Sequence, residues 1–188
     1  LVTFLLLPLY TNHFTPEEYG VVALFYTFVP LLSIVVRYGM GAAFLKNYVP
    51  AGEKDRISIM TNVISSLFIS GVAFLTVFYI FKENLSFIFF GVSNPSYVIM
   101  MGVIIFFDTI WSIPMLAFRA ENRPRTFILL SFLNVGITLI CNLSFIIIFK
   151  MNIGSIFISN LIASSTIFIL ILPFIYQRFE FSSLSAVK

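Results

Sequence analysis

Apolar residues occur in long runs, and the polar residues between them are confined to short segments. The runs cover residues 1–14, 20–45, 57–81, 97–118, 126–149 and 156–176. A membrane-spanning helix needs about 20 mostly apolar residues, because the hydrocarbon core of a bilayer is about 30 Å thick. A strand of a membrane barrel would place a polar residue at every second position, which these runs do not do. The pattern therefore predicts an all-α, polytopic transmembrane helix bundle.

The first run differs from the others because it is short and begins at Leu1, already inside an apolar stretch. A secretory signal peptide would show a basic segment before its apolar core and small residues at a cleavage site. Neither feature occurs in residues 1–14. We therefore interpret this run as a truncated first span and expect the chain to be a fragment of a longer membrane protein.

Charged residues are few, and their distribution between the loops predicts an orientation. The chain is 60% hydrophobic and 10% charged, whereas a soluble domain carries about 25% charged residues. One set of alternate loops, with the C-terminal tail, holds Lys46, Lys54, Arg56, Arg119, Arg123, Arg125, Arg178 and Lys188. The other loops hold Lys82 and Lys150. Because cytoplasmic loops are enriched in Lys and Arg, the first set and the N-terminus are predicted to be cytoplasmic.

Two stretches leave the local structure open. Residues 82–96, KENLSFIFFGVSNPS, are not plainly polar. They form either a short amphipathic segment in the outer interface or a simple extension of the preceding helix. In RYGMGAA, Gly39 and Gly41 allow either close helix packing or a local break, and close packing is the favoured interpretation.

Arg37 and Asp108 are the charged residues that lie inside the predicted spans. A lipid-exposed charge near a helix centre costs about 2.5–3.5 kcal/mol, so both are expected to face protein or water. Arg37 lies nine residues before Lys46, and Asp108 lies eleven residues before Arg119. At about 1.5 Å per residue, both charges are then about 13–16 Å from the same membrane surface.

The residues around these charges suggest a polar path. Ser33 shares the helical face of Arg37, and Ser112 continues the face of Asp108, with Trp111 beside it. One interpretation is a water-filled cavity lined by these five residues, where a substrate anion or a coupling cation binds. The other is a structural ion pair between Arg37 and Asp108 that joins two helices. Intramembrane charges serve both purposes, and the sequence does not decide between them.

Small and hydroxylated residues recur at helical spacing in three other spans. They are Asn62, Ser66, Ser70 and Ala73; Ser131, Asn134, Thr138 and Cys141, with Asn142 adjacent; and Asn160, Ala163 and Ser164. Such stripes are more typical of helix–helix packing than of a lumen lining.

Several kinds of chemistry find no support in the sequence. There is no phosphate-binding GxxxxGK[ST] loop, no His, Cys and acid cluster with metal-ligand spacing, and no nucleophile paired with a base. His13 near a membrane end is expected to be a surface residue, and Cys141 in mid-span to pack without a disulfide. We therefore expect no enzymatic activity, no cofactor, no metal and no nucleic-acid partner.

Four segments resemble a known family. FTPEEYGVVAL, after the first run, resembles a family start of the form L-G-P-E-E-Y-G, and FRAENRPRTFILLSFLNV resembles its L-R-A-E-N-R-P segment after the fourth helix. FKMNIGSIFISNLIAS is similar to its turn between helices five and six, and DTIWSIPMLAFRAENR to a branch with an acid and an I-P dipeptide in helix four. The family is the polysaccharide biosynthesis proteins, the O-antigen and capsule flippases of the multidrug/oligosaccharidyl-lipid/polysaccharide exporter superfamily.

The resemblance covers essentially the whole chain and implies an architecture. Members have about 12–14 helices in two six-helix lobes that face a central cavity and work by alternating access. Residues 1–188 would then be the N-terminal transmembrane lobe, without the C-terminal lobe. Relatives carry a cationic lumen residue in the setting R-x-x-x-G-A, and that role is transferred to Arg37.

The resemblance also implies a function. The protein would translocate a polyprenyl-pyrophosphate-linked oligosaccharide across the bacterial inner membrane for O-antigen, capsule or exopolysaccharide synthesis. Arg37 would bind the pyrophosphate, since a guanidinium donates in pairs to phosphate oxygens, and Asp108 would couple transport to an ion gradient. Arg119, Arg123 and Arg125 would anchor the topology or gather anionic head groups at the cytoplasmic mouth.

Other functions stay open at this point. A drug or metabolite/cation antiporter, or a lipid II flippase of the same superfamily, would share the fold. A non-transporting scaffold of a polysaccharide assembly complex belongs to a different class. The expected partners are the lipid-linked substrate, membrane lipid and the glycosyltransferases or polymerase of the pathway.

Overall fold

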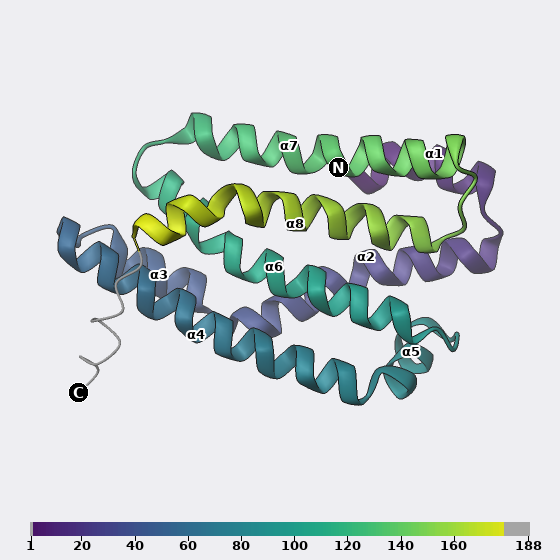
Figure 1. The fold of residues 1–188 in the computed structure, drawn as a ribbon, viewed down its shortest axis with the longest axis horizontal. Helices are drawn as coiled ribbons and strands as arrows, with labels where there is room; N and C mark the ends of the chain where they lie inside the picture. The colour runs from purple at the N-terminus through teal and green to yellow at the C-terminus, as the bar shows by residue number, and fades with distance from the viewer. Residues whose placement is uncertain (1, 179–188) are drawn as a thin grey trace.

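A computed structural model describes residues 2–178, and that range is almost entirely helical (Figure 1). Its elements are α1 (Val2–His13), α2 (Pro16–Arg37), α3 (Met40–Tyr48), α4 (Glu53–Ile80), α5 (Lys82–Phe90), α6 (Pro95–Ala120), α7 (Pro124–Leu143), the π-helix η1 (Ser144–Ile148) and α8 (Gly154–Gln177). Five segments are long and apolar enough to cross a membrane: α2, α4, α6, α7 with η1, and α8. The prediction of an all-α, polytopic helix bundle is confirmed. Leu1 and Lys188 lie outside the described residues.

The helix α6 is the centre of the bundle. The long helices lie side by side along the longest axis (Figure 1), and α6 contacts α2, α3, α4, α5, α7 and α8. In its most apolar stretch 56% of the residues are buried, against 17% for α7 with η1. A polar side chain on α6 is therefore surrounded by protein more than one on any outer helix would be.

Residues 20–45, which the apolar pattern presents as one span, contain a helix break. The helices α2 and α3 meet at Tyr38 and Gly39, whose φ angles are 32° and 82°. Positive φ disfavours L side chains, whereas glycine adopts it without a steric penalty. At Gly41, an added Cβ would lie 3.3 Å from Leu116 Cδ1. The stretch thus combines a break at its first glycine with close helix packing at its second.

Residues 82–96 do not extend the preceding helix. Phe81 separates α4 from α5 with φ of −100° and ψ of 15°, and α5 packs against α2 and α6. Gly91, with φ of 67°, ends the short helix. The interpretation as a separate segment at the bundle end, and not as a helix extension, agrees with the structure.

The TPEEYG segment forms the N-terminus of α2. The hydroxyl of Thr15 accepts the backbone N–H of Glu18 at 3.3 Å, and the Glu18 carboxylate accepts the backbone N–H of Thr15 at 3.0 Å. Pro16 occupies the first helical position, where a missing N–H costs nothing. This reciprocal arrangement is a capping box, which satisfies two donors that the helix itself leaves unpaired.

The RAENRP segment reverses the chain between α6 and α7. Asn122 adopts φ of 55°, a conformation that asparagine tolerates better than most residues. The backbone N–H of Arg123 bonds to Phe118 O at 2.8 Å and that of Asn122 to Arg119 O at 3.3 Å, which is a Schellman motif. Pro124 then opens α7 at its first position. The motif therefore fixes the direction in which the side chains of this turn project.

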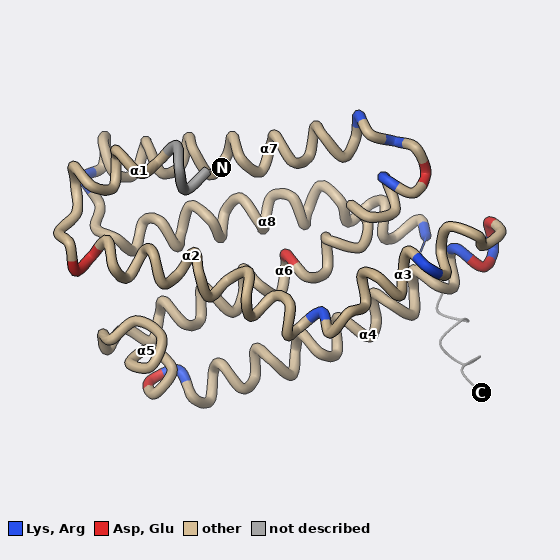
Figure 2. Tube along the Cα trace, turned by 180° about the vertical axis from the view of Figure 1, so that it is seen from behind, with Lys and Arg blue, Asp and Glu red and all other residues tan. Residues whose placement is uncertain are grey.

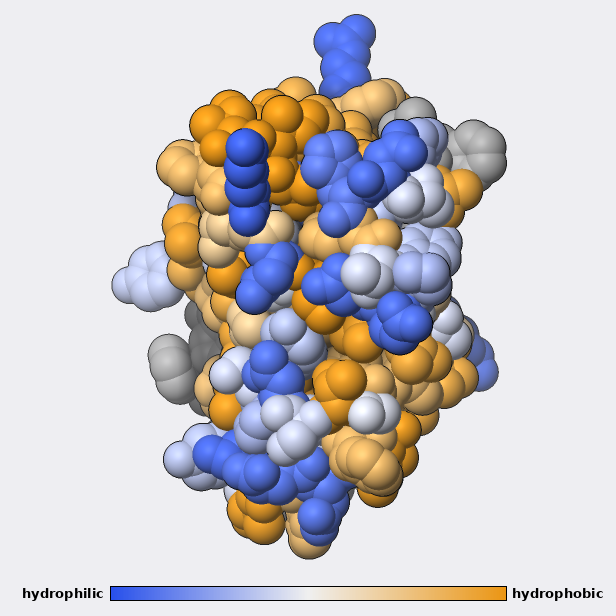
Figure 3. All heavy atoms as spheres, turned by 90° about the vertical axis from the view of Figure 1, so that its right-hand side faces the viewer, coloured by the Kyte–Doolittle hydropathy of each residue, from blue (hydrophilic) through white to orange (hydrophobic). Residues whose placement is uncertain are grey.

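Charged and apolar residues occupy different parts of the surface. Lys, Arg, Asp and Glu gather toward the two ends of the bundle (Figure 2), and hydrophilic residues spread over the end that carries the α1–α2 and α5–α6 connections (Figure 3). Between the ends, large apolar side chains are exposed, for example Ile69 at 70% and Phe132 at 72%. This distribution suits a bundle whose sides face lipid or a second protein surface and whose ends face water.

Candidate functional site

A cavity of about 350 Å³ lies between α2, α6, α7 and α8. It is lined by Phe25, Tyr26, Val29, Ile104, Asp108, Trp111, Ser131, Asn134, Val135, Asn160 and Ser164. Asp108 lies halfway along α6, so the cavity is near the middle of the bundle. It also lies between the two apolar clusters of the core: Phe25 and Ile104 belong to one, and Trp111 packs against the other. We call it the central cavity.

Asp108 is the charged residue in the wall of the central cavity, and its hydrogen bonds come from neutral groups. Trp111 Nε1 donates to Asp108 Oδ1 at 2.9 Å, and the Ser164 hydroxyl donates to the same oxygen at 2.6 Å. Within residues 2–178, Oδ2 has no hydrogen-bond partner. One carboxylate oxygen is therefore positioned by α6 and α8, while the other is available to a ligand.

The amide of Asn134 is a second open group on this wall. Its side chain makes no hydrogen bond within the described part of the chain, and Ser131, one turn earlier on α7, donates its hydroxyl to Phe127 O at 2.8 Å. Asn134 and Ser131 thus line the same cavity as Asp108. Carboxylate, amide and hydroxyl oxygens are suitable ligands for a hard cation or for the hydroxyl groups of a sugar.

A chain of polar side chains begins at two further cavity residues, Asn160 and Tyr26. Asn160 Nδ2 donates to the Tyr26 hydroxyl at 3.1 Å, and the hydroxyls of Tyr26 and Tyr10 are 3.3 Å apart. The Tyr10 hydroxyl donates to Asn142 Oδ1 at 3.2 Å. The chain connects α8, α2, α1 and α7, so it fixes the relative positions of four helices around the cavity.

Arg37 ends α2 and does not line the central cavity. Its Nε is buried and has no hydrogen-bond partner among the described residues. No ion pair joins Arg37 and Asp108 in residues 2–178. The structural ion pair considered from the sequence is therefore not formed, and a buried guanidinium nitrogen is left for another acceptor.

The two predicted serines of the path point elsewhere. The Ser33 hydroxyl donates to Val29 O at 2.7 Å, and that of Ser112 donates to Thr109 O at 2.7 Å. Neither lines the central cavity, whereas the predicted Asp108 does. Both serines satisfy their own helix backbone, which is the usual arrangement for a serine within an apolar helix.

Four cavity residues belong to stripes that the sequence favoured as packing surfaces. These are Ser131 and Asn134 on α7 and Asn160 and Ser164 on α8. Ser164 and Asp108 are 56 positions apart in the sequence, and only the packing of α6 on α8 brings them together. The sequence holds no signal that separates these stripes from the stripe Asn62, Ser66, Ser70 and Ala73 on α4, which also contains an asparagine and does not line the cavity.

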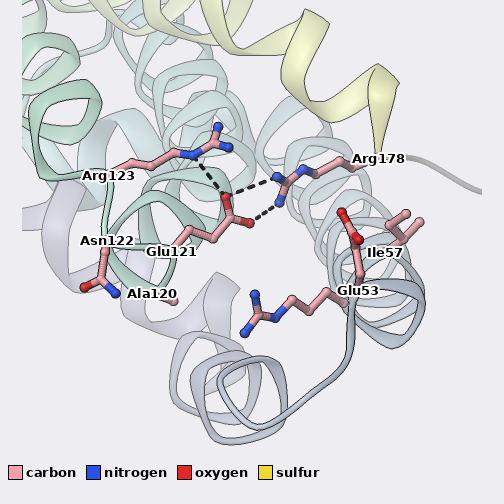
Figure 4. Close-up of a pocket in the computed structure, with 8 residues that line it drawn as sticks. Glu53, Ile57, Ala120, Glu121, Asn122, Arg123 and Arg178 are labelled. Atoms are coloured by element: carbon pink, nitrogen blue, oxygen red, sulfur yellow. Dashed lines mark hydrogen bonds and ion pairs between the residues drawn. The ribbon is translucent and has the colours of Figure 1, made fainter.

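A second pocket, of about 480 Å³, lies at the end of the bundle (Figure 4). It is lined by Glu53, Arg56, Ile57, Ala120, Glu121, Asn122, Arg123 and Arg178. These residues come from the start of α4, the turn between α6 and α7, and the end of α8. We call it the arginine pocket.

Glu121 joins the walls of the arginine pocket. Arg178 donates from Nη1 and Nη2 to the two carboxylate oxygens of Glu121, and the Tyr48 hydroxyl donates to Oε1 at 2.5 Å. Arg178 Nη1 also donates to the Tyr48 hydroxyl at 2.8 Å. Arg123 Nε lies 3.6 Å from Oε2 (Figure 4). The side chain of Glu121 is 9% exposed, so this network holds the ends of α3, α6 and α8 together.

The protonation of this network follows from its contacts. Burial raises the pKa of the Glu121 carboxyl, but the hydrogen bonds from Arg178 and Tyr48 outweigh burial and hold the pKa below its usual value. Burial, with the nearby Glu121 carboxylate, raises the pKa of Tyr48 to about 12. Glu121 is therefore ionised and Tyr48 neutral at neutral pH.

The three arginines predicted at the cytoplasmic mouth are placed differently from one another. Arg123 lines the arginine pocket, whereas Arg119 lies over the ring of Phe127 with its Cζ 5.3 Å from the ring centre. Arg125 is exposed and does not line the pocket. Arg56 and Arg178, which the sequence suggested only as topology signals, take the other cationic positions in the pocket wall.

No metal site accompanies either pocket in the described residues, since no group of three or more His, Cys, Asp or Glu is placed to hold an ion.

In comparisons with known proteins, the model of the family described as polysaccharide biosynthesis protein matches residues 1–188. No curated protein and no solved structure matches the chain. The match extends over both the central cavity and the arginine pocket.

Proposed function

The chain belongs to the polysaccharide biosynthesis protein family, and from this premise we propose that it translocates a polyprenyl-pyrophosphate-linked oligosaccharide across a bacterial inner membrane. The family match and the five membrane-crossing helices support a multi-pass membrane protein with a transporter role in polysaccharide synthesis. The lipid-linked substrate, the membrane and the ion-coupled mechanism belong to the proposal.

The physical problem for such a substrate is its head group. Moving one unpaired hydroxyl or amide group into hydrocarbon costs about 4–8 kcal/mol, and an oligosaccharide carries many hydroxyls. A pyrophosphate adds negative charge, which is more costly still. The protein therefore needs to offer a polar path for the head group while the polyprenyl tail stays in lipid.

The observation that carries the proposal is the central cavity. It places one carboxylate, two asparagines and several hydroxyls at mid-depth in a bundle whose sides are apolar. Binding sites at the middle of the membrane, between helices that move relative to one another, are the arrangement expected for alternating access. Its neutral oxygens and amides match the hydrogen-bonding groups of sugars.

In this proposal Arg37 binds the pyrophosphate. Its buried Nε is without a partner in the described part of the chain, and a guanidinium donates two parallel hydrogen bonds to phosphate oxygens. The residue ends α2 directly before the break at Tyr38 and Gly39. Rotation about these two residues would move the guanidinium without unwinding either helix.

Asp108 is the proposed site of ion coupling. It accepts hydrogen bonds from Trp111 and Ser164, both neutral, so binding a proton or a cation breaks no ion pair. A unit charge that crosses a potential of 100 mV releases about 2.3 kcal/mol, which is enough to bias an equilibrium between two states about fiftyfold. The family resemblance and the absence of a nucleotide-binding loop in the sequence favour this energy source.

The proposal is tested by export in cells that depend on the protein for surface polysaccharide. We expect Arg37→Ala to abolish export and Arg37→Lys to retain part of it, because lysine keeps the charge and loses the paired donors. Lys46→Ala, which removes a cation from the neighbouring helix α3, is the matched control. Normal export by Arg37→Ala at a normal protein level would exclude the head-group role.

The second candidate function is a metabolite or drug/cation antiporter. Asp108 is negative, and Phe25, Tyr26 and Trp111 add aromatic surface to the same cavity. An acid with aromatic rings is a recognised combination for organic cations. Efflux of a fluorescent organic cation from proteoliposomes, lost in Asp108→Asn and unaffected by Arg37→Ala, would favour this candidate over the flippase.

A further inference from the structure

The arginine pocket has more positive than negative charge and more hydrogen-bond donors than its own acceptors use. Its wall carries Arg56, Arg123 and Arg178 against Glu53 and Glu121. Each guanidinium has five N–H donors. Among the described residues, Arg178 uses three hydrogen bonds to hold Glu121 and Tyr48. The remaining donors face a pocket of about 480 Å³.

Arg56 and Arg123 are the two guanidiniums of the wall in which at least one terminal nitrogen makes no hydrogen bond to the described residues. Arg56 donates from Nε to Tyr48 O and from Nη2 to Val49 O, both at 3.2 Å, which leaves Nη1 unused in residues 2–178. Its Cζ lies 5.3 Å from the centre of the Tyr48 ring, so the group is held in place from two sides. Arg123 approaches Glu121 only through Nε at 3.6 Å, and its side chain is 55% exposed.

The carboxylates do not cancel these donors. Glu121 is satisfied by Arg178 and Tyr48. Glu53 lies on the opposite side of the pocket from Arg123 (Figure 4), and no ion pair of Glu53 is formed within the described part of the chain. An entering anion therefore meets Arg123 beside a carboxylate that is already neutralised.

The position of the pocket in the bundle indicates which kind of anion it would bind. It is formed where α4 begins and α6 and α8 end, which is the level of the head groups if these helices cross a bilayer. Val49, whose carbonyl accepts Arg56, has an apolar side chain that is 54% exposed, and Tyr176, in the last turn of α8, is 84% exposed. A tyrosine at this level is typical of the membrane interface.

From this geometry we infer that the arginine pocket is a binding site for the phosphate of a membrane lipid, held between Arg56 and Arg123 on the frame formed by Tyr48, Glu121 and Arg178. The site is separate from the central cavity. Its ligand is identified as a terminal lipid phosphate because two guanidiniums offer paired donors and the neighbouring surface is apolar. The inference rests on the proposed membrane function in one respect only: the pocket lies at the level of the lipid head groups because the helices that form it cross the bilayer in that proposal.

The test is lipid binding by the purified protein, measured by native mass spectrometry with dioctanoyl phosphatidic acid as the probe. We expect Arg56→Gln with Arg123→Gln to weaken binding about a hundredfold, taking about tenfold for each lost guanidinium. The matched control is Arg119→Gln with Arg125→Gln, which removes the same charge from the same end of the bundle outside the pocket. It is expected to change binding less than twofold.

A single substitution, Arg123→Gln, separates a loss of lipid binding from a loss of folding. Arg56 supports the end of α3 through two backbone carbonyls, so its loss can unfold this corner. Arg123 is half exposed and outside that support, so Arg123→Gln alone is expected to weaken binding about tenfold with an unchanged melting temperature.

Three results would overturn the inference. Equal losses in the pocket variant and in the control variant would mean that only the overall charge matters. Unchanged binding in the pocket variant would place the lipid elsewhere. Displacement of the lipid by an equal concentration of inorganic pyrophosphate would mean that the pocket takes free phosphate and not a lipid. None of these measurements needs transport, so their failure is distinct from a failure of the proposed export function.

Discussion

Asp108 and Glu121 lie thirteen residues apart, one inside α6 and one at its end, and they have different partners. Asp108 accepts hydrogen bonds from an indole and a hydroxyl, both neutral. Glu121 accepts from Arg178, with Arg123 nearby and Tyr48 completing the network. An acid held by fixed positive charges stays ionised, whereas an acid held by neutral donors binds a proton or cation without breaking an ion pair.

The comparison assigns different tasks to the middle and to the C-terminal end of one helix. The Glu121 network ties α3, α6 and α8 together where they emerge at the bundle end, so it is suited to stability. The central cavity leaves one oxygen of Asp108 and the amide of Asn134 open, so it is suited to ligand exchange. Removing one partner at a time separates these tasks.

Removal of the main partner of Glu121 has the largest expected effect on stability. Arg178→Gln leaves a nearly buried carboxylate without its paired donors, and we expect the free energy of unfolding to fall by about 1.5–3 kcal/mol. Thermal unfolding in detergent at pH 7 measures this. Arg125→Gln, exposed at the same end, is the control and should change little. Equal melting temperatures for Arg178→Gln and the control would show that the network does not hold the helix ends.

Loss of a neutral donor to Asp108 is expected to affect transport more than stability. Ser164→Ala removes the 2.6 Å hydrogen bond, and we expect translocation to slow about tenfold, equivalent to about 1.4 kcal/mol in the barrier. Ser112→Ala is the matched control, because that hydroxyl bonds to its own backbone outside the cavity. The initial rate of translocation in proteoliposomes measures both variants. Equal initial rates for Ser164→Ala and Ser112→Ala would contradict a role of the Ser164 hydrogen bond in transport.

The smallest expected effect is a change in pH dependence. The pKa of Glu121 is below its usual value in the folded protein, so its contribution to stability is complete above the unfolded pKa of about 4.3. That contribution is lost as the pH falls through the lower, folded pKa. Glu121→Gln should therefore flatten the decline in melting temperature below about pH 4. If the melting temperature of the variant declines with falling pH as steeply as that of the wild type, other carboxyl groups cause the decline.

The fold was accessible from the sequence because the bilayer imposes a simple rule. Each apolar run must become a helix, and the runs are long enough to recognise one by one. The helix break at Tyr38 and Gly39 was not predicted, because Gly39 and Gly41 are compatible with close packing as well as with a break, and packing was the favoured interpretation. The start of α2 was encoded locally, in the capping box of Thr15 and Glu18.

The candidate site was only partly accessible. Asp108 is conspicuous because a carboxylate inside an apolar run is costly, and Trp111 follows it by less than one helical turn. Ser164 and Asn160 were not, because small polar residues on a helix look the same whether they face a neighbour or a cavity. The partner of Glu121 was hidden for another reason: Arg178 is 57 positions away, and only the packed bundle brings the two helix ends together.

The most direct test of the central claim is the ion dependence of translocation by Asp108→Asn. Wild type and variant are reconstituted in proteoliposomes, and initial rates are compared with and without an imposed proton or sodium gradient. Glu121→Gln, which removes the acid at the end of the same helix, is the control. The account predicts that one gradient accelerates wild type and Glu121→Gln, while Asp108→Asn translocates slowly at the same rate with or without it. The same gradient response in Asp108→Asn as in wild type would contradict the account.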